Sequence, residues 1–217
     1  MRQGVRPTLA TVFLFVLAAA WSRAGSGDGQ APHTPLVPDR LIGDRIAPLL
    51  LLSRDDIRAD VGLDARQSAD LERAIAELHA RAAALRGKTG PSVISARTAI
   101  DESMQRWIDA HLSEDQRVRL IQVDLWWEGP SALVTRPIVA DTLSLNPSQR
   151  ETLSRAVNEY HQKRRSRTLR PEDVDHLAKL AFDLLSPEQR LRYNEMRGRP
   201  IKLEPQVAAG ARGPSLK

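Results

Sequence analysis

Cysteine is missing from the 217 residues of this chain. Its absence excludes disulfides, a thiol nucleophile, thiolate metal sites and the lipidated cysteine that anchors a lipoprotein. Aromatic residues make up only 4% of the sequence, although large aromatics normally supply much of the area buried in a thick core. We therefore expect a thin, extended structure whose core consists of leucine, isoleucine, valine and alanine between helices.

The sequence signatures of common catalytic sites are also missing. There is no GxSxG, no HExxH and no glycine-rich loop that could hold a phosphate. Residue type alone makes Glu77, Glu159, Asp175 and His176 candidate acids or bases. Because no catalytic constellation supports them, we assign no catalytic or cofactor-binding residue and expect a protein that is not an enzyme.

An apolar run near the N-terminus predicts export. Arg2 and Arg6 precede uncharged residues 9–21, and Ser22 to Ala24 follow in the small-x-small pattern of a cleavage site. Residues 1–24 are thus predicted to be a secretory signal peptide, which places the mature chain in the periplasm or outside the cell. The alternative is an uncleaved membrane anchor, but crossing a bilayer takes about 20 apolar residues.

Little net charge remains once this segment is removed. The full chain carries +5, and cleavage takes away three arginines, which leaves 29 basic against 27 acidic residues and a charge of +2. So small a charge gives no electrostatic reason to expect binding to nucleic acid.

Apolar residues recur at helical spacing in four segments, whereas no stretch alternates for long enough to predict a strand. Turn and helix-start signals separate the segments at Gly87 to Pro91, at Gly129 with Pro130, and at Pro171, while Pro48 splits or kinks an early apolar segment. The pattern predicts an all-α fold. The four apolar stripes are Leu71, Ala74, Ile75, Leu78, Ala82 and Leu85; Val93, Ala96, Ile100, Met104, Trp107 and Ile108; Leu153, Ala156, Val157 and Tyr160; and Val174, Leu177, Ala178, Ala181 and Leu185.

One motif occurs four times: a leucine, a short polar residue and, three positions after that residue, a glutamine. It matches the capping box, in which the short side chain accepts from the third helical N–H while the glutamine returns to the cap's own N–H. Each copy therefore predicts a helix start. The copies are LDARQ (residues 63–67), LSEDQ (112–116), LNPSQ (145–149) and LSPEQ (185–189).

The surroundings of the motif also recur. Residues 54–81 align without gaps on 136–163 with eight identities in 28, and residues 112–119 align on 185–192 with five in eight. We therefore predict two similar helical hairpin units in one chain. The predicted divisions are a signal peptide (1–24), a disordered linker (25–38), repeat unit 1 (39–128), repeat unit 2 (129–197) and a disordered tail (198–217).

The repeated motif resembles the LTxxQ motif of the periplasmic family that includes Spy, CpxP and the zinc-responsive ZraP. The resemblance implies an all-helical fold and a role in envelope stress: holding unfolded clients, damping a sensor kinase or sensing metal. Threonine, the usual second residue of that motif, is replaced by Asp64, Ser113, Asn146 and Ser186. All four replacements are good helix caps.

Two histidines occupy aligned positions in the two halves, and each follows a glutamate by two residues. These pairs are Glu77 with His79 and Glu159 with His161. Residues two apart on a helix point in different directions and do not chelate one ion, so a metal site would need both halves to meet. We assign no metal ligand and interpret both pairs as half-exposed surface residues.

Two further features have alternative interpretations. The basic run Lys163 to Arg170 suits a helix C-terminus, where cations complement the helix dipole, although it could also bind an anionic surface or a client. Trp126 and Trp127 lie at the junction of the halves, where they either pack the joint or form a client-binding surface.

The sequence therefore predicts a non-enzymatic exported binding protein, chaperone-like or an envelope-stress adaptor, whose partners are protein clients or envelope components. The alternative is a structural or scaffolding component of the cell envelope, and a metal sensor or enzyme comes third.

Overall fold

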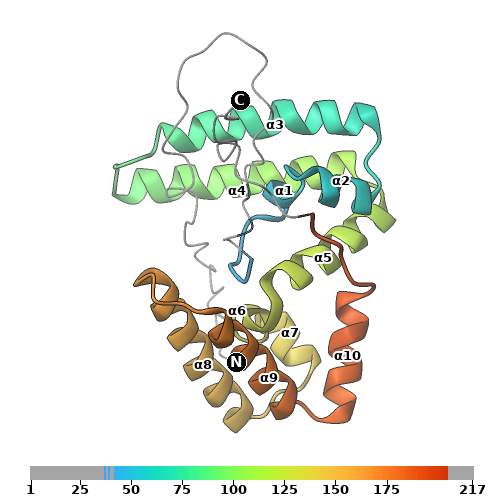
Figure 1. The fold of residues 1–217 in the computed structure, drawn as a ribbon. Helices are drawn as coiled ribbons and strands as arrows, with labels where there is room; N and C mark the ends of the chain where they lie inside the picture. Colours follow the sequence, from blue (N-terminus) through green and yellow to red (C-terminus); the bar gives the residue numbers. More distant parts are fainter. Residues whose placement is uncertain (1–36, 38, 40–41, 205–217) are drawn as a thin grey trace, which may run out of the picture.

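The computed structural model describes residues 37, 39 and 42–204, and in this part of the chain every regular element is helical (Figure 1). The predicted all-α fold is confirmed. No helix among these residues has both the length and the apolar character needed to cross a bilayer. The predicted signal peptide, residues 1–24, lies outside the described residues.

The helices begin and end where the turn signals lie. Helix α1 starts at Pro48, α4 at Pro91 and α9 at Pro171, and α5 ends directly before Gly129. In each of these three starts the proline occupies the first turn, where a missing N–H costs nothing. The elements are α1 (Pro48–Leu51), α2 (Asp55–Val61), α3 (Ala65–Ala83), α4 (Pro91–His111), α5 (Glu114–Glu128), the 3-10 turn η2 (Gly129–Ser131), α6 (Ala132–Thr135), α7 (Pro137–Thr142), α8 (Pro147–Arg165), α9 (Pro171–Leu184) and α10 (Pro187–Arg197).

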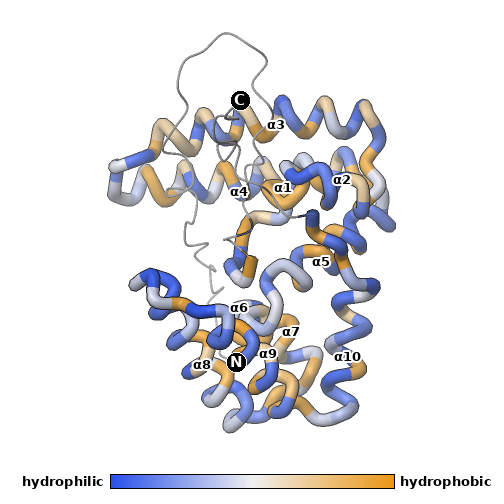
Figure 2. The backbone as a smooth tube through the Cα atoms, in the orientation of Figure 1, coloured by the Kyte–Doolittle hydropathy of each residue, from blue (hydrophilic) through white to orange (hydrophobic). Residues whose placement is uncertain are grey.

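Two hairpins dominate the arrangement. Helices α3 and α4 pack side by side in the upper half of Figure 1, and α8 and α9 do so in the lower half. Helix α5 runs between the two halves and packs against α10, the last helix of the lower half. The long helices are amphipathic, with apolar stretches alternating with polar ones along each of them (Figure 2).

The buried apolar side chains form two main clusters that divide near the end of α5. The first draws on residues 37–127 and the second on residues 125–193, with Trp127 in the first and Leu125 in the second. Aliphatic residues dominate both clusters, as the scarcity of aromatics predicts. Phe182 is an exception to burial, since it is 53% exposed on α9.

The predicted stripes lie on the buried faces with two exceptions. Val174 and Ala178 of α9 are exposed, whereas Leu85, which follows the end of α3, still packs on the first cluster. The buried face of α9 passes instead through Leu177 and Ala181. The prediction failed there because exposed alanine and valine residues can fit a 3.6-residue period as well as buried ones do.

Two segments outside the helices cross between the halves. Residues 42–45, which we had placed in unit 1, contact unit 2: Arg45 donates to the Thr135 carbonyl at 2.9 Å and Asp44 pairs with Arg164 at 3.1 Å. Residues 198–204, expected to be disordered, instead contact unit 1, where Ile201 and Leu203 pack on the first cluster.

These contacts correct two predicted boundaries. The tail prediction does not hold for residues 198–204, and Val37, assigned to the linker, is buried in the first cluster. The glycine and proline content that predicted disorder is compatible with an extended segment that is held by backbone and side-chain hydrogen bonds.

Candidate binding site

The four predicted capping boxes all form, with both reciprocal hydrogen bonds in each. Their glutamines also meet in pairs. In the lower half, the Gln149 amide donates to the Leu184 carbonyl at 2.7 Å and to the Gln189 side chain at 2.8 Å. Gln189 in turn donates to the Leu143 carbonyl at 3.0 Å. The start of α8 is thereby fixed to the start of α10.

The same arrangement recurs in the upper half. Gln67 donates to the His111 carbonyl at 2.7 Å and to Gln116 at 2.9 Å, and Gln116 donates to the Gly62 carbonyl at 2.7 Å. Two helix starts are again joined, here those of α3 and α5. Sequence analysis located the caps but missed the pairing, because a capping box explains each glutamine without reference to another.

An apolar pocket of about 250 Å³ opens between α9 and α10. Its position depends on the glutamine pair that holds α10, and on Tyr193, whose hydroxyl donates to the Gly129 carbonyl at 2.8 Å. Burial raises the pKa of Tyr193 to about 12, so the phenol remains a donor at neutral pH. The lining residues are Pro130, Leu133, Ala178, Ala181, Phe182, Leu185, Arg190, Tyr193, Asn194 and Arg197.

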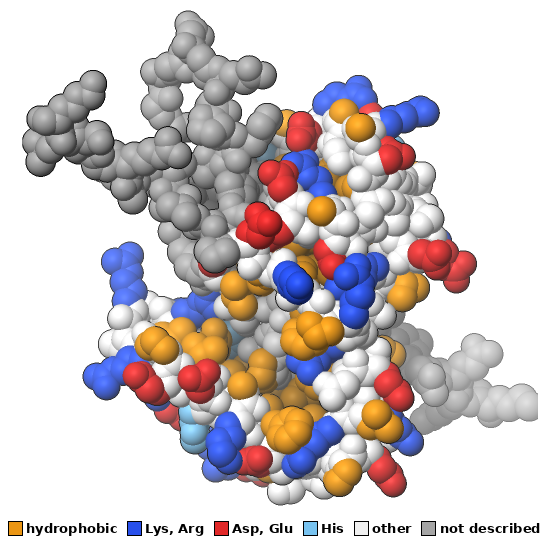
Figure 3. Space-filling model, turned by 45° about the vertical axis from the view of Figure 1, so that its right-hand side comes forward, with side chains coloured by type: hydrophobic (Ala, Val, Ile, Leu, Met, Phe, Trp, Pro, Cys, Tyr) orange, Lys and Arg blue, Asp and Glu red, His pale blue; other side chains and the backbone are white. Residues whose placement is uncertain are grey.

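Aromatic rings and arginines adjoin one another at this pocket. The guanidinium of Arg190 lies 4.1 Å from the ring centre of Phe182, and that of Arg197 lies 4.1 Å from the ring of Trp126 and 4.6 Å from that of Tyr193. Figure 3 shows hydrophobic side chains gathered on the lower half of the molecule, with basic side chains beside them. The surface can therefore accept an apolar group.

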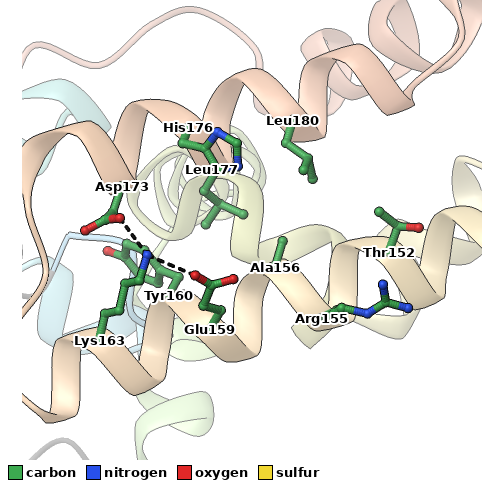
Figure 4. A pocket seen from close by; sticks show the side chains of 10 residues that line it. All are labelled: Thr152, Arg155, Ala156, Glu159, Tyr160, Lys163, Asp173, His176, Leu177 and Leu180. Carbon is green, nitrogen blue, oxygen red and sulfur yellow. Dashed lines mark hydrogen bonds and ion pairs between the residues drawn. The ribbon is translucent and has the colours of Figure 1, made fainter.

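A second groove, of about 200 Å³, lies between α8 and α9 (Figure 4). Two of the four candidate acids and bases, Glu159 and His176, line it. The ammonium group of Lys163 lies across it, 2.9 Å from Glu159 and 2.8 Å from Asp173. These hydrogen bonds raise the pKa of Lys163 and lower that of Asp173, which keeps the ionic bridge closed at neutral pH.

The other two candidates are not brought to this groove. Glu77 is exposed on α3 in the upper half, and Asp175 is exposed on α9 outside the lining. Glu159 is held in an ion pair with Lys163. The four residues do not form one constellation.

A buried ionic cluster joins the halves at the end of α5. Arg136 bridges two carboxylates, Asp124 at 2.6 Å and Glu128 at 2.5 Å, and Glu128 also accepts from the Thr135 hydroxyl. Asp124 is 2% exposed, and its Oδ1 has no hydrogen-bond partner. Burial raises the pKa of Asp124 to about 6, against the opposing effect of Arg136. Sequence analysis missed this cluster, because its acids lie among the apolar residues of an ordinary helix.

The aligned histidines have different surroundings. Burial lowers the pKa of both, with Arg86 adding to the effect at His79 and Asp44 opposing it at His161. His161 lies 3.8 Å from Asp44. Within the described part of the chain, no three histidine or acidic residues lie close enough together to hold a metal ion.

The basic run is engaged within the protein in part, through Lys163 and Arg164. Lys163, Arg164 and Arg165 occupy the last turn of α8, where the helix dipole favours cations. Arg164 also donates to the Ile42 carbonyl at 2.9 Å and pairs with Asp44. The first three basic residues of the run therefore lie at a helix C-terminus, and Arg167 and Arg170 follow it.

The adjacent tryptophans face opposite halves. Trp127 is buried in the first cluster, with the guanidinium of Arg54 5.5 Å from its ring centre, whereas Trp126 is half-buried beneath Arg197 of α10. The two rings thus pack on both sides of α5, as expected of residues about 100° apart on a helix. Both tryptophans contribute to the joint between the halves.

Comparison with known proteins adds no relationship: no family model, curated protein or solved structure matches the chain.

Proposed function

We propose that this chain is an exported, non-enzymatic binding protein, chaperone-like or an envelope-stress adaptor, which accepts apolar segments of protein clients. The observation that carries the proposal is the open apolar pocket between α9 and α10, where Phe182 is 53% exposed. A large aromatic costs free energy when it is left in water, roughly in proportion to its exposed apolar area. Exposed apolar surface next to a pocket is typical of binding sites.

We also propose that the two halves descend from one duplicated segment. Hydrogen bonds recur at aligned positions, since Leu63 donates to the Arg58 carbonyl and Leu145 to the Ala140 carbonyl, each at 3.0 Å. Arg54 and Arg136, which also align, precede short helices and each pair with two carboxylates. This recurrence supports the resemblance to the LTxxQ-motif family, whose chains carry two such motifs.

The test is aggregation of an unfolding client protein, followed by light scattering at an equimolar ratio of the mature chain. Wild type is expected to delay aggregation, and Phe182→Ser is expected to shorten the delay. Ile138→Ser is the matched control, because Ile138 is 71% exposed on α7 and lies outside the pocket. If wild type gives no delay, the chaperone-like role is wrong and a scaffolding role in the envelope becomes the better hypothesis.

A further inference from the structure

The charged residues that line the α9–α10 pocket have one sign, although Asp183, whose pKa is lowered mainly by Lys179, lies close enough to Arg190 for that arginine to help lower it. No aspartate or glutamate lines it, but two arginines of α10 do, Arg190 and Arg197. Among the described residues neither arginine forms an ion pair with a carboxylate. The side chain of Arg190 donates to the Phe182 carbonyl at 2.8 Å, and that of Arg197 donates to Asn194 at 2.6 Å. The nearby Asp183 pairs with Lys179 instead, at 2.5 Å.

Both arginines retain donors that a ligand could use. A guanidinium has five N–H groups in a fixed fork that matches a carboxylate. The Nε of Arg197 is buried without a hydrogen-bond partner, and burial lowers the pKa of this arginine. A carboxylate beside this guanidinium would supply an opposite charge.

The spacing of the two arginines suggests the form of the ligand. Arg190 and Arg197 are seven residues apart on α10, which corresponds to about 10 Å along a helix that rises about 1.5 Å per residue. A peptide extended in the polyproline II conformation rises about 3.1 Å per residue and returns to the same face every three residues, so side chains three positions apart share a face and are separated by about the same distance. The same pocket is lined by apolar residues, which include Leu133 and Ala181.

We propose that this pocket binds an extended protein segment in which apolar residues lie between two acidic residues three positions apart. The inference rests on the proposed function and specifies which client segments are preferred. Arg190 and Arg197 bind the two carboxylates, and the apolar side chain between them covers Phe182.

The experiment uses the mature chain and a capped hexapeptide, Gly-Glu-Leu-Leu-Glu-Gly, titrated by calorimetry. We expect binding that weakens about threefold to tenfold when both glutamates are replaced by glutamine, as expected for a charge-assisted hydrogen bond at a partly exposed site. Arg190→Gln is expected to weaken binding of the acidic peptide by a similar factor, and Arg190→Lys by less. Arg192→Gln, at an exposed position of the same helix outside the pocket, is the matched control.

The outcomes separate this proposal from the proposed function. Equal binding of the glutamate and glutamine peptides, or no effect of Arg190→Gln, overturns the acidic preference while the delay of client aggregation stands. If the wild-type protein does not delay client aggregation at all, the proposed function is overturned as well. A circular dichroism melt of each variant establishes that the comparison is made between folded proteins.

Discussion

The side-chain amides of Gln149 and Gln189 hydrogen-bond to each other while each also completes a capping box at its own helix start. Each glutamine therefore makes contacts within its helix and across to another one. The positions of α8 and α10 are coupled through a few polar atoms.

Loss of one of these amides should destabilise the protein. Gln149→Ala removes the bonds to Leu184 and Gln189 and leaves a part-buried carbonyl without its donor. We expect the free energy of unfolding to fall by about 1–3 kcal/mol in chemical denaturation. Gln162→Ala, at an exposed position of the same helix, controls for helix propensity. An equal loss in both variants would contradict a special role for the pair.

The buried carboxylate at the joint should make stability depend on pH. The pKa of Asp124 is about 6 in the folded protein, whereas an unfolded aspartate titrates near 4. Between these values the folded state binds more protons, so ionised Asp124 destabilises the protein above pH 6 and this penalty is removed as the pH falls towards 4.

This contribution can be isolated by substitution. When the pH is lowered from 7 to 5, the free energy of unfolding of wild type should rise by about 1 kcal/mol more than that of Asp124→Asn. Urea denaturation of both proteins at the two pH values measures this difference. The comparison between the two proteins cancels the histidines, whose lowered pKa values act in the opposite direction. Parallel pH profiles for wild type and variant would show that Asp124 does not titrate in this range.

A left-handed residue before the third capping box can be improved. Ser144 has a φ of 51°, and its aligned counterpart in the other half is Gly62, with a φ of 78°. Non-glycine residues in this region cost about 1 kcal/mol. Ser144→Gly should therefore raise the free energy of unfolding by up to about 1 kcal/mol. Gly62→Ser should lower it by a similar amount, since a side chain there meets no atom within 4 Å and only the backbone is strained. Thermal melts measure both changes. If the melting temperatures of the two variants shift in the same direction, this interpretation is wrong.

The segment after α10 should stabilise the upper half. Arg54 is fully buried and donates to the Glu204 carbonyl at 2.9 Å, and the Glu204 N–H donates to Asp56 at 2.8 Å. Deletion of residues 198–217 is expected to cost about 2–4 kcal/mol, because it removes the backbone partners of the buried Arg54 and Asp56 and uncovers the apolar surface on which Ile201 and Leu203 pack. Deletion of residues 205–217 retains these contacts and is the control. Tryptophan fluorescence during guanidinium unfolding measures both, since Arg54 lies over Trp127.

The sequence predicted the local structure better than the long-range contacts. The four glutamine motifs and the prolines determined the helix starts, because caps and first-turn prolines act through backbone groups a few residues away. The buried arginines could not be predicted in this way. Each depends on a carboxylate that tertiary folding brings near, Asp39 for Arg54 and Asp124 for Arg136, and local sequence does not distinguish these arginines from surface ones.

The sequence predicted an apolar face on the α9 segment but not which of its residues form the candidate site. An apolar stripe on the segment of α9 was expected, but the stripe included Val174 and omitted Phe182, whose exposed ring borders the pocket. Which face of an amphipathic helix remains uncovered depends on the neighbouring helix, here α10. That neighbour is held in place by the Gln149–Gln189 pair, which no periodicity reveals.

The crossing of residues 42–45 onto the lower half and of residues 198–204 onto the upper half has a consequence for any attempt to separate the halves. A cut at Gly129 would leave each fragment without a segment that completes it, because Asp44 and Arg45 would depart with the upper fragment and Ile201 and Leu203 with the lower one. Neither fragment would be self-sufficient, and the two would recover their structure only by reassociating.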